Sequence, residues 1–152
     1  ESSIVMRIYV DSDACPVKEE IIRVAARHGL PVTLIGNRWM RGFDSPQVEQ
    51  VIAPEGLNEA DDRIVERIGP GDIVVTADVP LAVRCLEKGS RGIDHRGKIF
   101  DQNSIGMASA MRDLMTHLRD SGLLQTGGPG AYGKQERSRF LDGLERLIQA
   151  MK

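Results

Sequence analysis

Apolar and polar positions alternate in blocks along most of this chain. Apolar runs of strand length occupy 4–10, 31–36, 48–53 and 72–77. The segments 16–28, 58–68 and 80–88 have apolar residues at helical spacing, and Gly29 and Gly89 follow two of them as helix-ending glycines. Strands that alternate with helices pair in parallel through right-handed crossovers. The pattern therefore predicts an α/β fold.

The last third of the chain has longer helical segments. Residues 91–100 are expected to form a short extended or hairpin element that turns at 95–97. A long amphipathic helix is predicted over 103–120, and a final helix over 136–151 would bury Phe140, Leu144, Leu147 and Ile148. The glycine-rich segment 125–133 is predicted to be a flexible loop, and so is the polar segment 37–47.

Length and composition favour a single domain. The chain has 152 residues, of which 41% are hydrophobic, and this suffices for one sizeable core. We expect 1–152 to form one three-layer α/β/α domain around a mainly parallel sheet, with residues 1–5 set aside as an end outside the fold. The absence of a long apolar run and the presence of two isolated cysteines predict a cytoplasmic protein with no membrane partner. The oligomeric state stays open.

Aspartates recur where predicted strands give way to helices. Asp11 and Asp13 follow the first strand, and Asp78 follows the strand at 72–77. The carboxyl ends of parallel strands meet at one edge of a sheet, where open α/β folds build their sites. These three carboxylates are therefore expected to lie near one another.

The predicted helix at 58–68 contributes two more acids. Asp61 lies on its apolar stripe, whereas Asp62 is turned about 100° away. Carboxylates are the ligands that Mg²⁺ and Mn²⁺ prefer, and no cluster of cysteine and histidine indicates zinc. The candidate metal ligands are Asp11, Asp13, Asp61, Asp62 and Asp78.

Helix capping is the competing interpretation of these acids. Asp11 and Asp13 would cap a helix that begins at Pro16, and Asp78 would cap the helix that follows it. Asp61 would take part in a capping box with Asn58. The agreement of several strand-end acids favours a site over caps alone.

Charge is distributed unevenly around a net value of −2. Residues 1–83 have 8 Lys/Arg and 14 Asp/Glu, while residues 84–152 have 12 and 8. An acidic half that binds cations and a basic half that binds phosphates would fit a metal-dependent enzyme acting on nucleic acid. The alternative, which we rate equally, is that the asymmetry of charge arose by chance.

The candidate nucleic-acid contacts are Arg84, Arg96, Lys134, Arg137 and Arg139. Trp39 or Tyr132 would stack on a base. The competing interpretations are a solvated helix face for the arginines near residue 137 and a packing anchor for Trp39.

Three segments resemble the YaiI/YqxD family of uncharacterised bacterial proteins. They are VDSDACPVK at 10–18, GDIVVTADVPLA at 71–82, and Gly127-Gly128-Pro129 with Arg137 and Phe140 downstream. That family is similar to PIN-like nuclease domains, which hold Mg²⁺ or Mn²⁺ on aspartates and cut phosphodiesters. The resemblance implies a PIN-like fold. In it, Asp11 matches the first-strand acid of those nucleases, Asp61 the acid of a D-x-x-I helix turn, and Asp78 the acid after the later strand. The resemblance further implies that Asp13 is an additional metal ligand. Asp62 and Asp101 correspond more loosely to the metal-binding acids of those nucleases.

Three hypotheses of function follow. The first is a divalent-metal-dependent nuclease, with RNA favoured, whose catalytic acids are Asp11, Asp13, Asp61 and Asp78. The second is a haloacid-dehalogenase-like phosphatase with Asp11 as nucleophile and Asp13 as acid/base, although Cys15 stands where that class has a small hydroxyl or β-branched residue. The third is a non-enzymatic PIN-like module that binds nucleic acid or protein.

Overall fold

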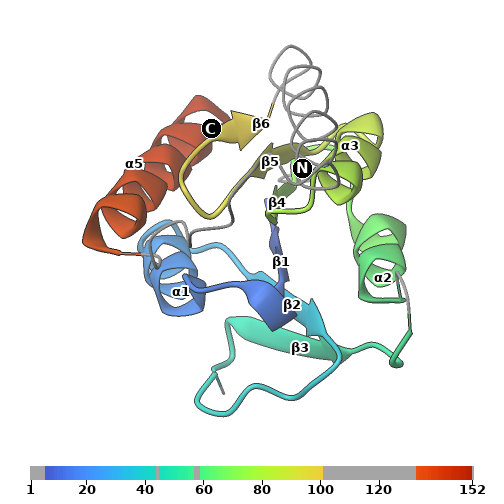
Figure 1. Cartoon of the computed structure of the whole chain (residues 1–152). Coiled ribbons are helices and arrows are strands. Elements are labelled where there is room, and N and C mark those ends of the chain that lie inside the picture. Colours follow the sequence, from blue (N-terminus) through green and yellow to red (C-terminus); the bar gives the residue numbers. More distant parts are fainter. Residues whose placement is uncertain (1–5, 44, 57–58, 101–132, 152) are drawn as a thin grey trace, which may run out of the picture.

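A computed structural model describes residues 6–43, 45–56, 59–100 and 133–151. Its centre is a six-stranded sheet in the order β3-β2-β1-β4-β5-β6 (Figure 1). The strands are β1 Ile8–Asp11, β2 Val32–Gly36, β3 Val48–Ile52, β4 Ile73–Val75, β5 Arg91–Ile93 and β6 Ile99–Phe100. Neighbouring strands pair in parallel, except that β6 is antiparallel to β5. The mainly parallel α/β sheet predicted from the sequence is confirmed.

Helices cover both faces of this sheet. They are α1 Lys18–Arg27, α2 Glu59–Arg67, α3 Val79–Glu87 and α5 Lys134–Met151, and a short 3-10 turn, η1 Ser12–Ala14, follows β1. Figure 1 shows α1 and α5 on one side of the sheet and α2 and α3 on the other. The architecture is therefore the predicted three-layer α/β/α arrangement.

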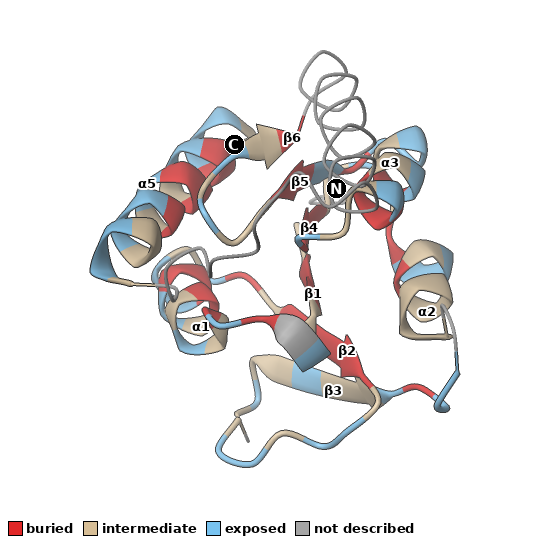
Figure 2. Cartoon of the chain, in the orientation of Figure 1, coloured by how far each residue is buried: buried red, intermediate tan, exposed pale blue. Residues whose placement is uncertain are grey.

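The side chains of β1 alternate between two cores. Ile8 and Val10 belong to the core that includes buried residues of α1 and α5. Tyr9 belongs to the second core, with Ile64 of α2 and buried residues of α3. Figure 2 shows the buried residues along β1, β2, β4 and β5 and on the inner sides of the helices, whereas β3 has none. Because successive strand residues point to opposite faces, Asp11 falls on the α2/α3 side.

The predicted start of the first helix at Pro16 is wrong. α1 begins at Lys18, because η1 occupies the first residues after β1 and Val17 takes the N-cap position. The Nζ of Lys18 donates to the carbonyl oxygens of Ser12 (3.0 Å) and Cys15 (2.6 Å). This clamp holds the turn that joins Asp11 to the helix.

The carboxyl-terminal elements agree with the sequence pattern where they are described. β5 and β6 form the predicted hairpin, and α5 begins at Lys134, slightly earlier than expected. Its buried residues include the four predicted ones, Phe140, Leu144, Leu147 and Ile148. The helix predicted at 103–120, most of the loop at 125–133, Asp101 and Tyr132 lie outside the described residues. Within the described ranges, no helix is long and apolar enough to cross a membrane.

A candidate acidic site at the carboxyl edge of the sheet

The strand order reverses between β1 and β4. The chain builds outward from β1 to β2 and β3 on one side, and from β4 to β5 and β6 on the other. Open α/β folds bind ligands outside the carboxyl ends of the strands at such a reversal. Asp11 is the last residue of β1, and the chain leaving β4 passes through Thr76 to Asp78. Two predicted site residues therefore lie at the reversal point.

Thr76 joins these two segments. Its hydroxyl donates to Oδ2 of Asp11 at 3.3 Å and accepts from the backbone N–H of Asp78 at 3.0 Å. Thr76 is fully buried, so this hydroxyl has no competing solvent. Reasoning from the sequence missed Thr76, and the only available signal was its position two residues before Asp78.

Like charges meet in this region. Burial is the main cause that raises the pKa of Asp11 to about 6, followed by repulsion from Asp61, while the hydrogen bond from Thr76 opposes the rise. Burial also raises the pKa of Asp61, followed by repulsion from Asp78, and Arg84 opposes it. The fold therefore places Asp61 and Asp78 close enough to Asp11 for their charges to raise its pKa.

Asp78 caps a helix as well. Its Oδ1 accepts from the backbone N–H of Leu81 at 3.1 Å, so the capping interpretation of Asp78 is confirmed. One cap bond leaves the second carboxylate oxygen for another role. The capping interpretation of Asp11 and Asp13 is wrong, because α1 begins beyond them and its N-cap residue makes no side-chain cap. The proposed capping partner of Asp61, Asn58, lies outside the described residues.

Two acids have other partners. The carboxylate of Asp13 accepts twice from the backbone N–H of Asn37, at 2.8 and 3.1 Å, and so fixes the start of the β2–β3 loop. It is exposed, and its charge is among the smaller contributions that raise the pKa of Asp11. Asp62 forms an ion pair with Arg84 at 2.9 Å. Asp62 is therefore a weaker metal candidate than Asp61, because Arg84 already contacts one of its carboxylate oxygens.

The donor set suits a hard divalent cation. The carboxylates of Asp11, Asp61 and Asp78 offer the oxygen ligands that Mg²⁺ and Mn²⁺ take. Over the described part of the chain, however, no three Asp, Glu, His or Cys side chains are already grouped to hold a metal ion.

The predicted nucleic-acid contacts divide into three groups. Arg84 is paired with Asp62, and Arg137 is paired with Glu20 at 2.9 Å, so both charges are already engaged. Lys134 is exposed at the start of α5. Arg96 and Arg139 line a cavity of about 280 Å³.

That cavity is basic. Its lining includes four cations, Arg96, Lys98, Arg139 and Arg146, and one carboxylate, Asp142. Asp142 lies 3.6 Å from Arg146. Two backbone hydrogen bonds are the main causes that lower the pKa of Glu136, and the nearby charges of Arg96 and Arg139 lower it further. The positive charge therefore exceeds the negative charge in this pocket. Sequence reasoning named two of the four cations.

Glycines allow the basic pocket to form. Gly97 lies in the β5–β6 turn at a φ of +89°, and Gly143 is buried in α5. A Cβ on Gly143 would lie 2.6 Å from the carbonyl oxygen of Gly97. The turn therefore lies directly against the helix. Because it follows the carboxyl end of β5, it shares the sheet edge of the acidic residues.

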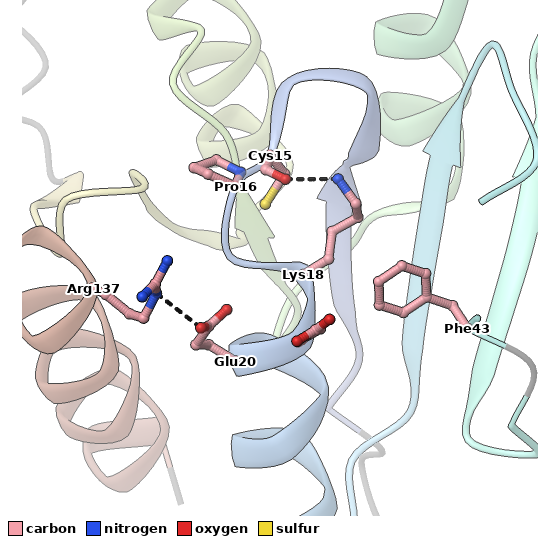
Figure 3. Close-up of a pocket in the computed structure, with 7 residues that line it drawn as sticks. Cys15, Pro16, Lys18, Glu20, Phe43 and Arg137 are labelled. Atoms are coloured by element: carbon pink, nitrogen blue, oxygen red, sulfur yellow. Dashed lines mark hydrogen bonds and ion pairs between the residues drawn. The ribbon is translucent and has the colours of Figure 1, made fainter. Parts of the chain in front are cut away.

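A second cavity, of about 220 Å³, lies at the start of α1 (Figure 3). Cys15, Lys18, Glu20 and Arg137 are among its lining residues, and the Glu20–Arg137 ion pair joins α1 to α5 beside it. Burial raises the pKa of the Cys15 thiol to about 11. A protonated, buried thiol is a poor nucleophile, and Cys15 packs in the core with residues of α1 and α5.

Comparison with other proteins adds the family. A model of the family described as "Uncharacterized BCR, YaiI/YqxD family" matches residues 9–150. The UPF0178 protein of Parvibaculum lavamentivorans is 55% identical over 145 residues, which cover 95% of each chain. The UPF0178 protein of Paramagnetospirillum magneticum is 49% identical over 146 residues, 96% of each chain.

Other comparisons agree with this match. A UPF0178 protein of Rhodopseudomonas palustris is 52% identical over 143 residues, 94% of this chain and 92% of the relative. No solved structure matches the chain significantly. Since the family match extends over nearly the whole fold, acidic site included, the chain belongs to the YaiI/YqxD family.

Proposed function

We propose that this protein is a divalent-metal-dependent phosphodiesterase of PIN-like type that acts on nucleic acid, with RNA favoured. The observation that carries the proposal is the partly buried carboxylate of Asp11 at the strand-order reversal, whose pKa is raised to about 6 by burial first and then by the charges of neighbouring acids, Asp61 foremost. Clustered carboxylates cost stability unless a cation neutralises them. A partly buried acid whose pKa is raised in this way, as that of Asp11 is, is typical of a functional site.

Each acid is supplied by a different element. Asp11 ends β1, Asp61 lies in the first turn of α2, and Asp78 precedes α3. In the proposal these three hold Mg²⁺ or Mn²⁺, and Thr76 keeps Asp11 and the α3 start in register. A cation held by these residues would lower the pKa of a water and would offset charge on the phosphoryl oxygens. Asp13 has a positioning role, because its carboxylate holds the β2–β3 loop.

Particular features of the structure separate the two alternatives, a phosphatase and a non-enzymatic binding module. For a phosphatase, Asp13 would have to act as acid/base beside Asp11, yet its carboxylate is engaged by the Asn37 N–H. This contact makes the phosphatase the weaker hypothesis. A non-enzymatic nucleic-acid-binding module is the second candidate, and it is favoured by the lack of a pre-grouped metal site among the described residues.

Calorimetric titration with Mn²⁺ tests the proposal without a choice of substrate. The wild type is expected to bind saturably, and Asp11→Asn and Asp78→Asn are each expected to weaken binding by tenfold or more. Asn at position 78 keeps the helix cap, so loss of binding there reports on the site rather than on α3. Glu87→Gln is the matched control, because Glu87 is exposed at the far end of α3.

Hydrolysis is then measured on single-stranded RNA with Mn²⁺. Metal-dependent cleavage that is lost in Asp11→Asn and kept in Glu87→Gln would support the phosphodiesterase. Saturable metal binding with no hydrolysis of RNA or DNA would favour the binding module. Metal binding that is indifferent to both aspartate changes would reject the site itself.

A further inference from the structure

Trp39 is a large apolar side chain on the surface. It is 60% exposed in the loop between β2 and β3. The interpretation of Trp39 as a packing anchor is therefore wrong. The exposed part of this aromatic ring is open to contact with a ligand.

The loop holds Trp39 in place from both sides. The side-chain amide of Gln50, in β3, accepts from the backbone N–H of Met40 at 2.8 Å and donates to the Met40 carbonyl oxygen at 2.9 Å. Before it, the Asn37 N–H is bound by Asp13, and after it Phe43 packs against the larger core. Trp39 is therefore presented by an anchored segment.

Arginines flank the tryptophan. Arg38 and Arg41 are both exposed, and neither forms an ion pair with another described residue. A guanidinium beside an aromatic ring is a combination that binds the phosphates and bases of a single strand together. A duplex offers its phosphates but hides the faces of its bases.

The loop starts beside the acidic residues. β2 ends at Gly36, and the next residue is the one that Asp13 binds. Trp39 lies two residues further on, so its Cα is within roughly 7 Å of that of Asn37. Asp13 in turn stands two residues after Asp11 in the chain, in the turn that leaves β1.

We propose that Arg38, Trp39 and Arg41 form a stacking platform for the bases of a single-stranded nucleic acid. The place of this platform beside a cutting site rests on the proposed function, whereas its binding of the nucleic acid requires no metal. The ring of Trp39 stacks on a base, and the two arginines contact the flanking phosphates. The substrate class is therefore single-stranded rather than duplex nucleic acid.

Trp39 is the only tryptophan in the chain, so it reports on its own contacts. Intrinsic fluorescence is titrated with oligouridine and with a duplex of equal length, at low salt and in EDTA. Saturable quenching by the single strand, and much weaker quenching by the duplex, is the expected result. Binding of labelled oligouridine, measured by anisotropy, is expected to weaken at least about fivefold in Trp39→Leu and less in Trp39→Phe.

The arginines are tested in the same assay. Arg38→Gln and Arg41→Gln are expected to weaken binding and to reduce its dependence on salt. Arg23→Gln is the control, because Arg23 is an exposed arginine of α1. A thermal melt of each variant verifies folding.

The platform would be overturned if oligouridine bound without a change in fluorescence, if Trp39→Leu bound like the wild type, or if no binding occurred at low salt. Because EDTA removes the metal, these outcomes are separate from a failure of the phosphodiesterase. Quenching without Mn²⁺-dependent hydrolysis would leave the platform in place and reject only the cleavage. Mn²⁺ binding and hydrolysis without quenching would reject the platform and leave the proposed phosphodiesterase in place.

Discussion

Asp11 is a carboxyl group whose surroundings disfavour its charge. Burial and the neighbouring acids raise its pKa from 3.8 to about 6. Between these values the folded protein binds more protons than the unfolded chain, so the contribution of Asp11 to stability falls as pH rises toward 6. Above pH 6 the cost is complete, and below pH 4 it vanishes.

This gives a prediction for the metal-free protein. Asp11→Asn is expected to raise the free energy of unfolding at pH 7.5 by on the order of 2 kcal/mol, a value reduced for partial solvent screening. At pH 4 the variant and the wild type are expected to be nearly equal. Urea unfolding in EDTA at both pH values measures this, and an equal gain at the two pH values would contradict the electrostatic explanation.

At the scale of the element, α3 depends on a side chain that the site also uses. Asp78→Ala removes the bond to the Leu81 N–H, so it is expected to cost about 1 kcal/mol of stability and to abolish Mn²⁺ binding. Asp78→Asn keeps the cap, so it is expected to lose Mn²⁺ binding without a loss of stability. Thermal melts beside calorimetry separate the two roles, and a shared loss of stability in both variants would contradict the separation.

Helix α5 carries a glycine that packing requires. Ala is the better helix former, so Gly→Ala in a free helix would stabilise by up to about 1 kcal/mol. At Gly143 a Cβ would lie 2.6 Å from the carbonyl oxygen of Gly97. Gly143→Ala is therefore expected to destabilise by about 2 kcal/mol through displacement of the β5–β6 turn.

Ser138→Ala is the matched control for this change. Ser138 is exposed in the same helix, and Ala there is expected to be neutral or slightly stabilising. Chemical denaturation of both variants gives the comparison. A stabilised Gly143→Ala would show that the turn moves away from the helix at little cost.

At the scale of the whole molecule, acidic and basic regions share the carboxyl edge of the sheet. The basic pocket between the β5–β6 turn and α5 is expected to hold phosphates that extend beyond the acidic site. The double variant Arg96→Ala/Arg139→Ala is expected to weaken binding of single-stranded RNA in all sequences alike. It should also lower the slope of log affinity against log salt by about one to two.

The salt series is run with Arg23→Gln as control. An unchanged slope in the double variant would place the phosphates elsewhere. A slope lowered equally by the control would indicate a general charge effect rather than the pocket.

The sequence by itself determined the alternation of strands and helices, because hydrophobic period and glycine or proline punctuation are local properties. It also placed acids at the ends of β1 and β4, and parallel pairing then brings such ends to one edge. The family was recognisable from the segments at 10–18 and 71–82, and the match over 9–150 confirms it. These features depend on residues near one another in the chain.

Only the tertiary structure decided which charges are available. The helical period already turned Asp62 away from Asp61, but only the packing of α2 beside α3 pairs Asp62 with Arg84. Arg137 is engaged by Glu20 of a distant helix, while Thr76 bridges two segments through one buried hydroxyl. Such pairings depend on side-chain direction and on elements packed together from far along the chain, and no local pattern encodes them.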